Sequence, residues 1–183
     1  QNRNALLMEF LRGGVDALPK DGPELCRQRL EAHASTIGRV MGVDMVLNNW
    51  DRIGNAALGS WLPDPTGFFA PADGPGNLDN LMLSAADDDN DGAEAEVIAI
   101  DTDLKPGYPQ PAASDADFVS DVDKLFCDLR ASERDSRTST IVREAQRCFE
   151  RKRGVVGLSN SALAALQRGV VEALSLLACR EEA

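Results

Sequence analysis

Apolar residues recur every three or four positions through the last third of the chain, a spacing that predicts amphipathic helices. The three apolar stripes span residues 118–130, 141–153 and 159–179. Ser159 or Ser161 is a suitable N-cap for the last of these helices. Charges alternate in sign from Arg130 to Arg153, which is typical of an exposed helix face. A similar apolar spacing from Glu24 to about Leu47 predicts one further long helix.

Two short apolar runs in the middle of the chain predict a β hairpin. Leu81–Leu83 and Val97–Ile100 lie on either side of an acidic turn at residues 87–92. Near the start, the apolar run of residues 5–11 stops at Gly13-Gly14, which favours a strand that leads into a hinge. The whole pattern predicts a mainly α protein with one small β hairpin, which is an α+β fold.

Size and charge narrow the classes of function. With 183 residues the chain fits one domain, or one large lobe of a bigger one. A formal net charge of -11 and a sequence pI of about 4.5 argue against a nucleic-acid surface and against a basic membrane patch. No apolar run approaches the roughly 20 residues of a membrane span. A metal cofactor or a basic partner suits an acidic protein better.

Cysteine and histidine usage bears on metal binding and on the redox environment. The four cysteines are far apart, at Cys26, Cys127, Cys148 and Cys179. The cysteines form no C-x-x-C pair and His33 is the single histidine, so the sequence lacks the ligand spacing of a zinc site. His33 is expected to be structural. Wide spacing inside predicted helices favours free, buried thiols and a cytoplasmic location.

Three polar residues attached to short apolar runs supply the chemistry of phosphoryl transfer. Asp51 opens an irregular loop, Asn80 directly precedes the first hairpin strand, and Asp101 directly follows the second. Because the end of one antiparallel strand lies beside the start of its neighbour, we expect Asn80 and Asp101 to lie together. Their amide and carboxylate oxygens suit Mg²⁺, and a loop carboxylate such as Asp51 can orient an attacking hydroxyl. Each residue alone is equally well explained as a turn or strand-end residue, so the joint pattern carries the hypothesis.

The segments around these residues resemble the catalytic domain of the actin-fragmin kinase family, atypical protein kinases with a protein-kinase-like fold. They read Asp-Met-Val-Leu-Asn-Asn-Trp-Asp-Arg, Gly-Asn-Leu-Asp-Asn-Leu-Met-Leu and Val-Ile-Ala-Ile-Asp. Leu6-Leu7-Met8-Glu9-Phe10 with Gly13-Gly14 also resembles the kinase hinge, so the motifs cover about residues 5–104. The resemblance implies a hinge-like segment 1–14 followed by a kinase C-lobe 15–183. Within that lobe it implies a catalytic loop 44–55, an inserted loop 53–76, a metal-site hairpin 80–104 and C-terminal helices 117–180.

What the resemblance implies is an enzyme dependent on ATP and Mg²⁺. Its substrate would be a serine or threonine hydroxyl of a protein, with actin or an actin-binding complex as the candidate partner. The implied site residues are Asp51 as catalytic base, Asn80 and Asp101 as metal ligands, and the backbone of Glu9, Phe10 and Leu11 as the adenine-contacting hinge. Asn55 lies nearer to Asp51 in the sequence and is a competing metal ligand.

Other functions stay open at this point. No glycine-rich phosphate loop and no strand lysine precede residue 5, so we expect a fragment without its N-lobe that turns over slowly. A catalytically inactive kinase-like scaffold is therefore an alternative. A cation-binding protein that uses Asp87, Asp89 and Asp91 is another. Ile98 stands where an EF-hand loop needs its glutamate, which favours a solvated hairpin tip.

Overall fold

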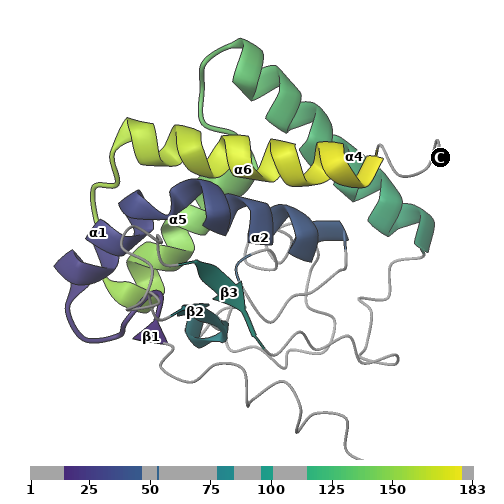
Figure 1. Ribbon diagram of the computed structural model, residues 1–183. Coiled ribbons are helices and arrows are strands. Elements are labelled where there is room, and N and C mark those ends of the chain that lie inside the picture. Colours follow the sequence, from purple (N-terminus) through teal and green to yellow (C-terminus); the bar gives the residue numbers. More distant parts are fainter. Residues whose placement is uncertain (1–14, 47–52, 54–77, 85–95, 101–114, 179–183) are drawn as a thin grey trace, which may run out of the picture.

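The computed structural model describes residues 15–46, 53, 78–84, 96–100 and 115–178, a mainly helical protein with one small antiparallel sheet (Figure 1). The helices are α1 (Pro23–Ala32), α2 (Ala34–Val46), α4 (Asp115–Arg134), α5 (Thr140–Arg153) and α6 (Asn160–Ala178). The strands are β1 (Val15–Asp16), β2 (Leu81–Leu83) and β3 (Val97–Ala99), and the short 3-10 helix η3 (Leu78–Asn80) leads into β2. The predicted α+β class is confirmed. None of the described helices has the length and apolar character needed to cross a membrane.

Helices α2 and α6 lie side by side and form the centre of the helical part (Figure 1). Three glycines, Gly38 and Gly42 in α2 and Gly169 in α6, lie where the two backbones come closest. A Cβ at any of them would collide with the other helix, so the absent side chains allow this close approach. The apolar residues around these glycines are fully buried, namely Ile37, Met41, Leu166 and Val170.

Two side chains, one from α4 and one from α6, hold the turn between α4 and α5. Asp128 in α4 accepts a hydrogen bond from the backbone N–H of Thr140 at 2.7 Å and pairs with Arg137 at 3.0 Å. Gln167 in α6 accepts one from the buried N–H of Ser139 at 2.8 Å and donates to the carbonyl of Arg137 at 3.3 Å. Together they satisfy N–H groups that have no partner within α5.

The ends of the last two helices follow ordinary capping rules. The backbone of Gly154 adopts φ 65°, and its N–H bonds to the carbonyl of Glu150, which ends α5. Ser159 accepts a hydrogen bond from the N–H of Ala162 at 3.2 Å, so Ser159 is the cap of α6. Glu31 of α1 accepts the N–H of Ser159 at 3.1 Å, which ties the start of α6 to α1.

The sheet has the order β1-β2-β3, with both pairs antiparallel. It lies on the side of α2 that faces away from α6 (Figure 1). In β2 and β3, Leu81 is opposite Ala99 and Leu83 is opposite Val97. The predicted hairpin is therefore confirmed. The third strand, β1, which pairs Val15 with Leu83, was not predicted.

The predicted long helix from Glu24 to about Leu47 is wrong, because α1 and α2 meet at His33. His33 has φ -110° and ψ 17°, so its backbone leaves the helical conformation. Its N–H still bonds to the carbonyl of Arg29, and its own carbonyl accepts the N–H of Ile37. The apolar spacing therefore continues across the break, which hides the break from the sequence pattern.

Two side chains have the opposite burial to the prediction. Arg153, expected on an exposed helix face, is buried because its guanidinium finds acceptors inside the fold. Cys127, expected to be buried, is exposed because it lies on the face of α4 opposite the buried Leu125 and Leu129. The other described thiols, Cys26 and Cys148, are free and buried as predicted, and Cys179 lies outside the described residues.

Candidate functional site

The open end of the β2–β3 hairpin brings Asn80 beside Ile100. The backbone N–H of Ile100 donates to the carbonyl of Asn80 at 2.9 Å, directly after the pair Leu81 and Ala99. Asp101 follows Ile100 in the chain and lies outside the described residues. Up to Ile100, the β2–β3 pairing therefore has the register that would bring the start of β2 and the end of β3 together, as the sequence pattern predicted.

Asn80 is buried, with 5% of its surface exposed, at the last position of η3. The apolar residues on either side of the site, Leu78 and Leu81, are fully buried and hold η3 against the core. An amide side chain at such a place is held in a defined position before any ligand arrives. Its oxygen is of the type that Mg²⁺ accepts.

The other predicted site residues lie outside the described residues. They are Asp51, Asp101, Asn55, Glu9, Phe10 and Leu11, together with Asp87, Asp89 and Asp91 of the acidic turn. The predicted grouping of these residues with Asn80 therefore stays a prediction. The structure does describe Ile53, two positions after Asp51, as a fully buried member of the main hydrophobic core. Asp51 thus stands in a short segment between the end of α2 at Val46 and this core residue.

An ion network surrounds Asp79, the residue before Asn80. Asp79 pairs with the guanidinium of Arg153 at 2.5 Å and with the ammonium of Lys20 at 2.5 Å. The side chain of Arg153 is only 4% exposed, and its Nε also donates to the carbonyl of Leu18 at 2.5 Å. Three segments that are distant in sequence therefore meet at Asp79: the chain after β1, η3 and the end of α5.

The charge state of Asp79 follows from this network. Partial burial acts to raise its pKa, but the hydrogen bond from Lys20 and the charge of Arg153 outweigh it and lower the pKa overall. Asp79 is therefore an anion near neutral pH, with a cation on each of its oxygens.

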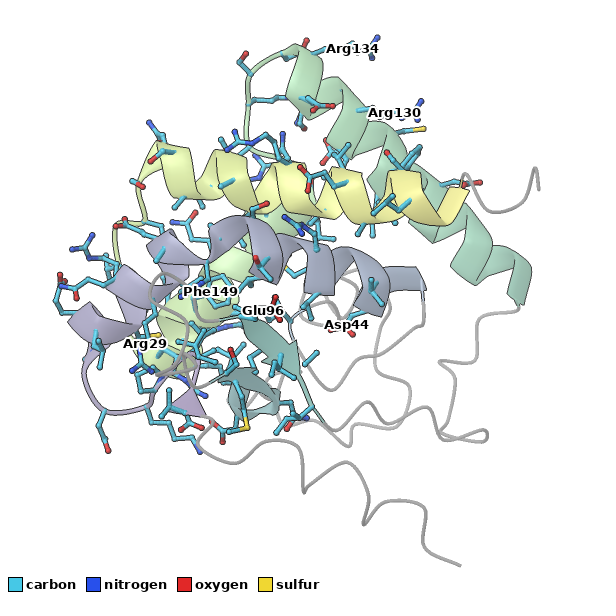
Figure 2. The ribbon with its side chains drawn as sticks, in the orientation of Figure 1. Arg29, Asp44, Glu96, Arg130, Arg134 and Phe149 are labelled. Atoms are coloured by element: carbon cyan, nitrogen blue, oxygen red, sulfur yellow. The ribbon has the colours of Figure 1, made fainter. Side chains whose placement is uncertain are left out.

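One buried carboxylate lies in α2. Asp44, close to the C-terminal end of α2, has 1% of its surface exposed and lies on the side of the helix that faces the sheet (Figure 2). A carboxylate is costly to bury and is found in such places when the surrounding structure compensates its charge. Asp44 precedes Asp51 by seven positions, so it belongs to the helix that leads into the predicted catalytic loop.

Sequence reasoning did not single out Asp44, Asp79 or Arg153. A signal existed for Asp44, which interrupts an apolar stripe at a core-facing position between Met41 and Met45. No local signal existed for the other two. Asp79 and Arg153 are 74 positions apart, and nothing in a basic helix end distinguishes a buried arginine from an exposed one.

The described residues contain no group of three or more histidine, cysteine, aspartate or glutamate side chains placed to hold a metal ion. No protein-family model, no curated protein and no solved structure matches the chain.

Proposed function

We propose that the protein binds Mg-ATP and transfers its terminal phosphoryl group to a serine or threonine hydroxyl of a protein. In this proposal the chain is the C-lobe of a kinase-like fold, similar to the catalytic domain of the actin-fragmin kinase family. Actin or an actin-binding complex is the first candidate substrate. The free, buried thiols Cys26 and Cys148 are compatible with a reducing, cytoplasmic location.

One observation carries the proposal. The hydrogen bond from Ile100 to Asn80 brings the end of the described hairpin beside a buried asparagine, and Asp101 is the next residue in the sequence. An amide oxygen and a carboxylate from adjacent strand ends form a donor set that suits Mg²⁺ on a nucleotide phosphate. The asparagine is buried and anchored, as a preorganised metal ligand should be.

Each proposed residue has a separate task. Asn80 and Asp101 supply oxygens that hold the metal ion against the phosphates. Asp51 would accept the hydrogen bond of the attacking hydroxyl and take its proton as the new oxygen–phosphorus bond forms, while the bond between the γ-phosphorus and the β–γ bridging oxygen breaks and ADP leaves. The backbone of residues 9–11 contacts the adenine ring. Bound Mg²⁺ supplies charge neutralisation at the transferred group.

Calorimetric titration with ATP, with and without MgCl₂, tests the metal site. We expect binding that depends on Mg²⁺. Replacing Asn80 by leucine, or Asp101 by alanine, should weaken that affinity by at least about tenfold, because even the loss of an outer partner of a metal ligand costs that much. Asn80→Asp keeps an oxygen ligand and should retain binding. Asp123→Ala removes one exposed carboxylate from α4 and serves as the charge-matched control.

Phosphoryl transfer is tested separately from binding. With actin as substrate and radiolabelled ATP, we expect Asp51→Asn to lower the rate by about 10²–10⁴-fold, the usual contribution of a positioned acid or base. Its ATP affinity should stay at the wild-type value. Wild-type ATP binding without transfer would favour the inactive scaffold. The absence of Mg²⁺-dependent ATP binding, or equal binding by the Asn80→Leu and Asp101→Ala variants, would overturn the proposal.

A further inference from the structure

Arg153 is the one buried cation among the described residues of this acidic protein. It lies at the last position of α5, directly before the glycine that ends the helix. A guanidinium has five donors in a rigid planar fork and keeps its charge at all ordinary pH values. Its burial is therefore understandable only through the acceptors that it serves.

Those acceptors belong to different segments. Nη2 contacts Oδ1 of Asp79 at 2.5 Å, Nε donates to the carbonyl of Leu18 at 2.5 Å, and Nη1 donates to the carbonyl of Lys152 at 3.2 Å. Asp79 is the neighbour of Asn80 in η3. Leu18 belongs to the chain that follows β1, a few residues after the predicted hinge. One planar side chain thus fixes the hinge-side segment and the metal-side segment relative to each other.

The same two segments also touch directly. The N–H of Ala17 donates to the carbonyl of Leu81 at 2.9 Å, and β1 pairs Asp16 with Met82. Arg29 of α1 donates to the backbone carbonyl of Asp16 in the hinge-side segment. Arg29 therefore binds the hinge-side segment from α1, whereas Arg153 binds both that segment and Asp79 from α5, which makes Arg29 a natural comparison for Arg153.

We propose that Arg153 is a positioning residue that couples nucleotide binding to metal binding, by joining the segment after the hinge to the loop that carries Asn80. This inference rests on the proposed function. Binding of adenine at the hinge would stabilise residues 15–18 in their place beside β2, and Arg153 would pass that stabilisation to Asp79 and so to Asn80. Two sites coupled in this way strengthen the binding of each other's ligands by the same factor.

The test measures the ratio of ATP affinity in saturating MgCl₂ to ATP affinity in EDTA, which reports the coupling. Three substitutions are compared with wild type: Arg153→Lys, Asp79→Asn, and the control Arg29→Lys. Lysine keeps the charge but not the fork, so it can serve one of the acceptors and not all of them. Asp79→Asn keeps the shape of the partner but removes its charge. Thermal unfolding of each variant establishes that it is folded.

We expect the affinity ratio to fall by about tenfold in Arg153→Lys and in Asp79→Asn, the lower end of what outer partners of metal ligands contribute. The double variant should lose no more of this ratio than the single ones, because both substitutions break the same contact between Arg153 and Asp79. Arg29→Lys should leave the ratio within about twofold of wild type even if it lowers stability, since the hydrogen bond of Arg29 goes to Asp16 on the hinge side. A merely structural role for Arg153 would lower stability and leave the ratio unchanged.

An unchanged ratio in folded Arg153→Lys and Asp79→Asn would overturn the coupling while Mg-ATP binding by wild type upheld the proposed function. An equal fall in Arg29→Lys would also overturn it. If Arg153→Lys does not fold, Asp79→Asn decides the question alone. Wild type that binds no ATP would remove the proposed function and this inference with it.

Discussion

Replacing the interface glycines of α2 and α6 by alanine should push the two central helices apart. A Cβ at Gly38 would lie 2.1 Å from the carbonyl oxygen of Leu166, and one at Gly169 would lie 2.0 Å from that of Ser35. Non-bonded heavy atoms need about 3.5 Å, so the backbones must separate by roughly 1 Å or more. A separation of that size removes up to about half of the dispersion energy of each contact across the interface.

The free-energy change has two opposing parts. Overpacking a buried site costs about 1–3 kcal/mol and sometimes more, and the upper end applies here because the colliding atoms are backbone. Alanine has about 1 kcal/mol better helix propensity than glycine, which offsets part of the cost. We therefore expect Gly38→Ala and Gly169→Ala each to lower the free energy of unfolding by about 2 kcal/mol or more.

A graded comparison makes the reasoning sharper. A Cβ at Gly42 would lie 2.8 Å from the Cβ of Ala173, so a smaller shift relieves it and Gly42→Ala should cost less. Ala164→Gly, at an exposed position of α6, isolates the propensity contribution and should cost about 1 kcal/mol. Because both severe variants open one interface, the pair Gly38→Ala with Gly169→Ala should cost less than the sum.

Urea unfolding followed by far-UV circular dichroism measures these values through the midpoint and the slope. A variant at Gly38 or Gly169 that is as stable as wild type would refute the close-packed interface. So would a cost for Gly42→Ala that exceeds both of the others. Since α2 leads toward Asp51, the severe variants should also lower phosphoryl transfer if the proposed function holds.

Two further predictions concern titration and thiol reactivity. Burial acts to raise the pKa of Asp128, but the N–H of Thr140 and the side chain of Arg137 outweigh it, so the pKa is lowered overall. The contribution of Asp128 to the stability of the fold is therefore full above a pH of about 4 and is lost as the pH falls through the folded-state pKa. The stability difference between wild type and Asp128→Asn should therefore shrink from pH 6 to pH 3 in urea titrations at about unit intervals, and a constant difference would contradict this. Burial raises the pKa of the Cys26 and Cys148 thiols, and only thiolates react quickly. A maleimide should therefore label the exposed Cys127 before Cys26 and Cys148, as measured by peptide mass spectrometry. Labelling of Cys148 in the native protein at the rate of Cys127 would contradict its burial.

Local patterns in the sequence predicted much of the described structure. The apolar spacing of the last third located α4, α5 and α6, and Ser159 was one of two predicted caps. Alternation of short apolar runs located β2 and β3, and with them the neighbourhood of Asn80 and Ile100. These features depend on neighbours within a few positions, where helix and strand geometry leave a direct imprint on the order of residues.

Tertiary structure decided the rest. A two-residue strand such as β1 has too few positions to show a pattern, and it exists because Leu83 and Met82 offer it a partner. The buried state of Arg153 depends on acceptors at Leu18 and Asp79, far away in the chain. The break at His33 preserves helical hydrogen bonds on both sides and so leaves the spacing intact.

The sequence by itself determined the last three helices, the hairpin and the polar residue at its open end, because each of these rests on short-range patterns. Only the tertiary structure decided that α2 and α6 meet through glycines, and that a buried arginine joins the segment after β1 to the residues beside Asn80. The contacts of Gly38 with Leu166 and of Arg153 with Leu18 join segments more than 100 positions apart, and Arg153 and Asp79 are 74 positions apart. Which residues meet in these contacts depends on how distant segments pack together, and not on the order of neighbouring residues in the sequence.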